Sequence, residues 1–169
     1  MPSSSTLTMP GPAPAITAAS RTEPTWRAVR AIPVGTCGSD IGHLVIGPGG
    51  VFTVNTKHHP GARVWVNGDT FLANGVHQPH VRTSRHEAQR AGDLLTAACG
   101  FPVRVRGVIL PVRADKVVVR EASDEVHVVA LVDFAFWLQH RPSVLDSPTQ
   151  DAVYAVACRS TTWHPAHLA

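Results

Sequence analysis

Three polar side chains near one glycine-rich turn have the types and the spacing to do chemistry together. They are the carboxylate of Asp40, the amide of Asn55 and the amine of Lys57. Carboxylate and amide oxygens can hold a hard divalent cation, which can polarise a phosphodiester while a lysine balances the phosphate charge. The structural alternative is a surface ion pair between Asp40 and Lys57, which would contribute about a few tenths of a kcal/mol. The spacing alone leaves both interpretations open.

A predicted β-hairpin brings these groups together. Residues 41–46 and 51–56 are β-prone, and the segment Gly47-Pro48-Gly49-Gly50 between them favours a turn, because proline fixes φ and glycines accept positive φ. Side chains alternate between the two faces of a strand. If Ile46 pairs with Val51, one face then carries three further pairs: Leu44 with Thr53, Gly42 with Asn55, and Asp40 with Lys57. His43 lies on the other, apolar face, where we expect it to be a core residue.

Further strands and helices must hold this hairpin. Strand patterns occur at residues 27–33, 63–66, 70–73, 103–110, 117–120 and 126–129. Ser84 and Glu87 have the spacing of a capping box, which predicts that a helix begins at Ser84 and ends at Gly100. Two more helices are predicted, one containing residues 131–138 and one beginning at Ser147. This order predicts an α/β fold with a mixed sheet flanked by helices.

The segment Asp40–His59 resembles the signature of the NERD (nuclease-related) domain. The resemblance continues through residues 64–66, 74–75, 84–88 and 159–163, so it covers residues 26–163. It implies a restriction-endonuclease-like core of the PD-(D/E)xK superfamily and an origin in DNA processing. In that superfamily, an acid on the first hairpin strand and an acid two residues before a lysine bind Mg²⁺.

This chain departs from the superfamily pattern at each acidic position. Gly42 and Asn55 stand where the pattern has acids, and Glu23, the nearest upstream acid, lies outside any predicted helix. Only Lys57 matches, although Asp40 is positioned to substitute as a ligand. The charges of Asp40 and Lys57 sum to zero, so a divalent ion gains little from this site. We therefore expect weak or lost Mg²⁺-dependent phosphodiesterase activity.

Two alternatives remain open for the function. One is a non-enzymatic module that binds nucleic acid or a protein on the same scaffold. The other is an active nuclease in which Asp40 and Asn55 hold the metal and Lys57 assists. DNA contacts are expected from Arg82, Arg85 and Arg90 near the start of the first helix, unless these residues form an ordinary polar helix face. His58 and His59 are expected to lie in a solvated loop rather than to bind zinc.

Composition bounds the remaining possibilities. The chain of 169 residues fits one domain, with 44% hydrophobic residues and a formal net charge of +3. We expect a Pro/Ser/Thr-rich tail at residues 1–25, the domain at 26–163 and a short tail at 164–169. No run of 18 apolar residues and no secretory signal is visible, so no membrane association is expected. Three scattered cysteines favour a reduced, cytoplasmic setting, and the arginine-rich, lysine-poor composition resembles that of actinobacterial proteins.

Overall fold

Two mixed β-sheets, rather than one, form the centre of the molecule. The computed structural model describes residues 26–34 and 39–164, with the side chains of residues 31–34 and 39–41 excepted. The tail predicted at residues 1–25 and most of the short one at the other end lie outside this part. The larger sheet has the strand order β1-β2-β3-β7-β9, and the smaller sheet has the order β6-β5-β4-β8. The predicted α/β class with flanking helices is confirmed, and the architecture is consistent with a restriction-endonuclease-like fold.

The predicted strands and helices follow one another along the chain in the expected order, with one extra strand and one extra helix. The strands are β1 (Arg27–Val34), β2 (Ser39–Gly47), β3 (Gly50–His58), β4 (Arg63–Asn67), β5 (Thr70–Ala73), β6 (Val76–Gln78), β7 (Val105–Val112), β8 (Lys116–Glu121) and β9 (Val126–Val128). The helices are α2 (His80–Cys99), α3 (Phe134–Gln139), α4 (Ser147–Ala157) and α5 (Ser160–Trp163), with a 3-10 turn at Leu131–Asp133.

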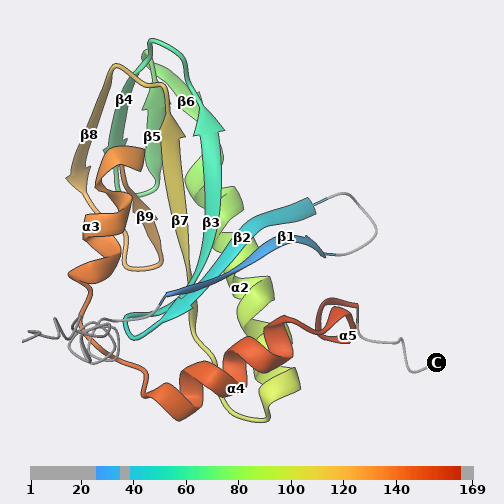
Figure 1. Cartoon of the computed structure of the whole chain (residues 1–169). Coiled ribbons are helices and arrows are strands. Elements are labelled where there is room, and N and C mark those ends of the chain that lie inside the picture. The colour runs from blue at the N-terminus through green and yellow to red at the C-terminus, as the bar shows by residue number, and fades with distance from the viewer. Residues whose placement is uncertain (1–25, 35–38, 165–169) are drawn as a thin grey trace, which may run out of the picture.

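The two sheets are successive parts of one parallel ladder. β3 pairs with β7 in parallel, and β4, which follows β3, pairs in parallel with β8, which follows β7. Backbone hydrogen bonds bridge the break, from His59 N to Val112 O at 3.1 Å and from Asp115 N to Ala62 O at 2.9 Å. Figure 1 shows β3 beside β7 and β4 beside β8, while β1 and β2 bend away.

Helix α2 covers one face of both sheets, and α3 packs on the opposite face of the larger sheet (Figure 1). Odd-numbered residues of β3 face α2, whereas even-numbered residues face α3, because side chains alternate along a strand. Leu44 and Val51 pack with Leu95 of α2 and Val153 of α4 on the first face. Phe52 packs with residues of α3 on the second face. The sheet therefore separates two distinct chemical environments.

Helix α2 begins four residues earlier than the capping box predicts. Its first residue is His80, its N-cap is Pro79, and no side chain caps it. Ser84 consequently lies inside the helix and is 2% exposed. The Ser84–Glu87 capping box is therefore a wrong prediction: a local sequence signature gave way to packing of the helix on the sheet. Strand β6 and helix α5 were not predicted, because both are too short to show a period.

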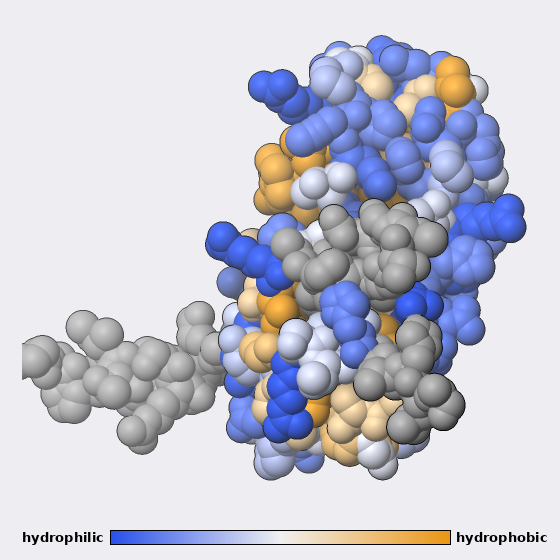
Figure 2. Space-filling view, turned by 90° about the vertical axis from the view of Figure 1, so that its right-hand side faces the viewer, coloured by the Kyte–Doolittle hydropathy of each residue, from blue (hydrophilic) through white to orange (hydrophobic). Residues whose placement is uncertain are grey.

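Large hydrophobic side chains rarely reach the surface of the described part. The exposed ones are Val76, Val119, Leu131, Val132, Phe136 and Val144. Figure 2 shows hydrophilic residues over most of the side it presents, with hydrophobic residues in small separate groups. Within the described residues, no helix is long and apolar enough to cross a membrane.

Candidate functional site

The hairpin forms with the predicted register near the turn, but the predicted pairs Gly42–Asn55 and Asp40–Lys57 lie beyond the end of the ladder. Ile46 pairs with Val51 and Leu44 with Thr53, and the described ladder runs from the turn to the His43–Val54 pair. Beyond that pair β2 continues to pair with β1 but no longer with β3. The backbone N of Gly42 in β2 instead donates a hydrogen bond to the Asn55 side chain of β3. The expected core position of His43 is wrong: its side chain is exposed, at the point where β2 leaves β3.

Asn55 lies at the centre of the candidate site. Its side chain is 9% exposed, and both ends of its amide are bonded. Oδ1 accepts a hydrogen bond from the backbone N of Gly42 at 3.3 Å, which places these two residues on one face as predicted. Nδ2 donates to a carboxylate oxygen of Glu87. The amide therefore links β2, β3 and α2.

Glu87 supplies an acid that the sequence analysis did not place in the site. It follows Ser84 by three residues and precedes Ala91 by four, so it shares the helix stripe that faces the sheet. Its position on the same face of the helix as the buried residue Ala91 was the feature of the sequence that could have placed Glu87 in the site. Burial raises the pKa of the Glu87 carboxyl, and the Asn55 hydrogen bond and the charge of Lys57 only partly offset this shift.

Lys57 lies near enough to both Glu87 and His80, the first residue of α2, for its charge to act on them. The Nε2 atoms of His80 and His59 are 3.0 Å apart, so one ring donates a hydrogen bond to the other. Burial first, then Lys57 and His59, lower the pKa of His80 to about 4. His59 lies in the loop after β3 as expected, and His58 is exposed, but the ring of His59 is only partly solvated because it packs against His80 and Phe71.

Helix α2 reaches Asn55 because one glycine lets it approach the sheet. A Cβ atom on Gly107 of β7 would lie 2.1 Å from Ser84 Oγ and 3.2 Å from Ser84 O. A larger residue there would displace the Ser84 hydroxyl and crowd the backbone of α2. The same close approach brings Glu87, one helical turn further along, to Asn55. We call Asn55, Lys57 and Glu87 the Asn55 site.

A family comparison agrees with this arrangement. The family model described as "NERD: Nuclease-related domain" matches residues 16–111, which is more than half of the chain. The chain belongs to the NERD family. The match contains β1 to β7 except the end of β7, and therefore every member of the Asn55 site. Comparisons with curated proteins and with solved structures gave no match.

The NERD chain keeps little room for an acid at position 42. A Cβ atom there would lie 2.9 Å from Val54 O and 3.3 Å from Asn55 Oδ1. Both neighbours are oxygens, so a carboxylate at this position would need a backbone shift and would meet repulsion. The backbone of Asp40 pairs with Pro33 of β1, and its side chain lies outside the described part.

The donor set of this NERD protein fits Mg²⁺ poorly. Among the described residues, no group of three His, Cys, Asp or Glu side chains could hold a metal ion. The Asn55 oxygen already accepts a bond from Gly42, and Lys57 balances the one carboxylate of the site. Mg²⁺ prefers one or two free carboxylates and several further oxygens.

The three arginines predicted to touch DNA are not equivalent. Arg85 is bonded to Asp69 and to Glu125, with 2.6 Å between its Nε and the Glu125 carboxylate. Arg82 and Arg90 are exposed and form no ion pair with any described residue. Arg82 and Arg90 are therefore the more available cations on this helix.

Proposed function

We propose that this NERD protein binds the phosphodiester backbone of DNA at the Asn55 site and hydrolyses it weakly or not at all. The observation that carries the proposal is the charge balance of the site. It brings together one carboxylate, one amine and an amide whose two polar atoms are both engaged. Such a set attracts a phosphate through Lys57 but offers little to a divalent cation.

Mg²⁺ remains the cofactor that the NERD resemblance implies, and any residual hydrolysis would use it. Asp40 and Asn55 are the ligands that the sequence suggests, and Glu87 is the carboxylate that the structure adds. The scattered cysteines and the arginine-rich composition support a cytoplasmic protein of actinobacterial type. The fold, with its mixed sheets flanked by helices, supports placement in the PD-(D/E)xK superfamily.

A non-enzymatic module that binds nucleic acid or a protein is the second candidate function. The same observation favours it, because a neutral site can lose catalysis while the scaffold keeps its shape. An active nuclease that uses Asp40 would need the side chain of Asp40 to reach Lys57 and Glu87.

DNA binding tests the proposal directly. Fluorescence anisotropy with a labelled duplex is expected to show weak binding that falls steeply with salt and depends little on sequence. Lys57→Met is expected to weaken binding about threefold to tenfold, because it removes a phosphate contact. Lys116→Met is the matched control: Lys116 is the second of two lysines in the chain and lies exposed on β8.

Two results would contradict the proposal. One is equal loss of affinity in Lys57→Met and Lys116→Met, which would remove the Asn55 site from binding. The other is strong sequence preference that persists at high salt.

Arg82→Gln and Arg90→Gln test the two unpaired arginines of α2. Each variant should reduce the slope of log binding constant against log salt concentration by about 1 if that arginine contacts a phosphate.

A further inference from the structure

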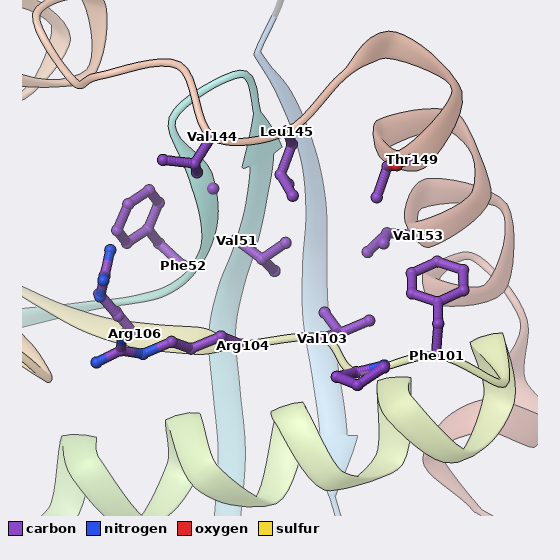
Figure 3. A pocket seen from close by; sticks show the side chains of 12 residues that line it. Val51, Phe52, Phe101, Val103, Arg104, Arg106, Val144, Leu145, Thr149 and Val153 are labelled. Atoms are coloured by element: carbon purple, nitrogen blue, oxygen red, sulfur yellow. The ribbon is translucent and has the colours of Figure 1, made fainter.

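A cavity of about 330 Å³ lies at the other end of β3 and β7 from the Asn55 site. This volume falls in the range of small-molecule sites. The lining comes from the start of β3, the segment between α2 and β7, and α4 with the segment before it (Figure 3). Hydrogen bonds from Val144 N and Leu145 N to Pro48 O, at 2.8 and 3.0 Å, fix one wall to the hairpin turn.

The cavity is apolar along one part and cationic at one end. Figure 3 shows Phe101, Val153 and Leu145 on one side, and Arg104 and Arg106 together at the opposite end. Thr149 of α4 also points into the cavity. The shape therefore separates a place for an apolar body from a place for a negative charge.

A third arginine and a histidine lie close to this cationic end. Arg141 stacks on Trp137, with 4.7 Å from its Cζ to the ring centroid. His127 packs on the same ring and on Phe52. Three nitrogens in this group are buried without any hydrogen-bond partner: Arg106 Nε, Arg141 Nε and His127 Nε2. We call Arg104, Arg106 and Arg141 the arginine cluster.

No described residue neutralises the arginine cluster. None of the ion pairs in the described part involves these arginines. Burial first, then the charges of Arg104 and Arg141, lower the pKa of Arg106, and Asp124 is the acid that partly opposes this shift. Arg106 and Arg141 are partly buried and Arg104 is exposed, and without a counterion these like charges repel one another. A bound anion would relieve that repulsion.

We propose that this cavity binds an amphipathic anion, a phosphate or carboxylate group that carries an apolar chain or ring. The anionic group lies against Arg104 and Arg106, since guanidinium groups bind such groups through two parallel hydrogen bonds. The apolar body lies between Phe101, Leu145 and Val153. The site is independent of the proposed function, because it lies on different residues.

Calorimetric titration of the full chain tests this site with four probes. Octyl phosphate and octanoate combine the two features and differ in the anionic group, whereas inorganic phosphate and octanol each carry one feature. At least one of the first two is expected to bind tenfold or more tightly than either single-feature probe. The better of the two identifies the anionic group.

Variants separate the two halves of the cavity. Arg106→Met should weaken binding of the better probe at least tenfold, while leaving the melting temperature equal or higher, because it relieves like-charge repulsion. Arg104→Gln, at an exposed residue, should weaken binding without any risk to folding. Thr149→Phe should fill the apolar part and weaken binding of the better probe. It keeps the bond from its backbone N to Asp146, although it loses the side-chain bond to that residue. Arg120→Gln, at an exposed residue of the other sheet, is the control and should change nothing.

Four outcomes would overturn the proposal. Inorganic phosphate that binds as tightly as octyl phosphate would show that the apolar cavity is not used. Octanol that binds as tightly as octanoate and octyl phosphate would show that the arginines are not used. No measurable binding of any probe, or unchanged binding in both Arg104→Gln and Arg106→Met, would show that the cluster is not a site.

Discussion

The two faces of the larger sheet carry charge in opposite ways. On the α2 face, Asn55 has partners for both ends of its amide, and the charges of Lys57 and Glu87 balance. On the α3 face and at the base of the sheet, the arginine cluster has no ion pair among the described residues and leaves buried nitrogens unbonded. The charges of the first region balance within the site itself, whereas those of the second are balanced only if the proposed anion binds.

Strand β3 connects these regions because consecutive residues point to opposite faces. Phe52 packs under the arginine cluster, while Thr53 and Asn55 face α2. Substitutions at neighbouring positions of one strand can therefore perturb one region and spare the other.

The largest expected effect comes from Phe52→Ala. Phe52 is fully buried and contacts the rings of Trp26, His127 and Trp137. Removal of a buried phenyl ring leaves a cavity, so the free energy of unfolding should fall by about 3–5 kcal/mol in urea denaturation. Thr53→Val is the control on the other face: its buried hydroxyl has no partner, so its loss should be neutral or stabilise by up to about 1 kcal/mol. Equal losses in both variants would contradict the division of the sheet into two environments.

A second effect follows from Asn55→Asp, which turns the balanced site into an acidic one. The new carboxylate would face Glu87 and lose the Asn55 hydrogen bond, so the metal-free protein should lose about 1–3 kcal/mol of stability at neutral pH. Added Mn²⁺ should restore the melting temperature. Asn67→Asp, at an exposed residue of β4, should show neither change. A destabilised Asn55→Asp protein that does not respond to Mn²⁺ would argue against a latent metal site.

Much of the fold could be predicted from the sequence, because its signals are local. Alternating side chains and the Gly47–Gly50 turn define the hairpin, and the register from Ile46–Val51 is confirmed. The division into two sheets was not predicted, because it depends on pairing between strands far apart in the chain.

The candidate site was predicted only in part, for the same physical reason. Lys57 and Asn55 lie on one strand and are visible in one motif, whereas Glu87 comes from a helix 32 residues away from Asn55. The sequence assigned Glu87 to a capping box, although its spacing of four residues from Ala91 also fits the face of the helix that packs on the sheet. The arginine cluster comes from two segments far apart in the chain, residues 104–106 and residue 141, and has no sequence motif.

A third prediction concerns the loss of stability at acidic pH, to which one histidine near the arginine cluster and one near the Asn55 site contribute. The pKa values of His127 and His80 are lowered from 6.5 to about 4, chiefly by burial. Between these values the unfolded chain binds more protons than the folded chain, so stability falls as the pH drops from 6.5 towards 4 and is unaffected above.

Substitution should reduce this dependence at each residue separately. His127→Gln and His80→Gln should each recover on the order of 1 kcal/mol at the acidic end of that range, after allowance for solvent screening. The measurement is urea denaturation at several pH values. His77→Gln, at an exposed residue of β6, should leave the slope unchanged. A slope that neither His127→Gln nor His80→Gln alters would contradict the burial of these rings.

The smallest effect compares a paired arginine with an unpaired one. Arg85 bonds Asp69 and Glu125 at the surface, so Arg85→Met should cost up to about 1 kcal/mol. Arg106→Met should instead be neutral or stabilise by a similar amount, because it relieves repulsion. The difference between the two variants should shrink at high salt. A clear loss of stability in Arg106→Met would show that Arg106 has a structural partner.

Plasmid nicking in the presence of Mg²⁺ or Mn²⁺ is the decisive test of whether the Asn55 site lacks catalytic activity for want of a second carboxylate. We expect little nicking by the wild-type protein and at least a tenfold gain in Asn55→Asp, since the site then has two carboxylates beside Lys57. Lys57→Met in the Asn55→Asp background should abolish the gain. Robust nicking by the wild-type protein that both Lys57→Met and Glu87→Gln abolish would contradict the claim, because the Asn55 site would then be a working metal-dependent nuclease.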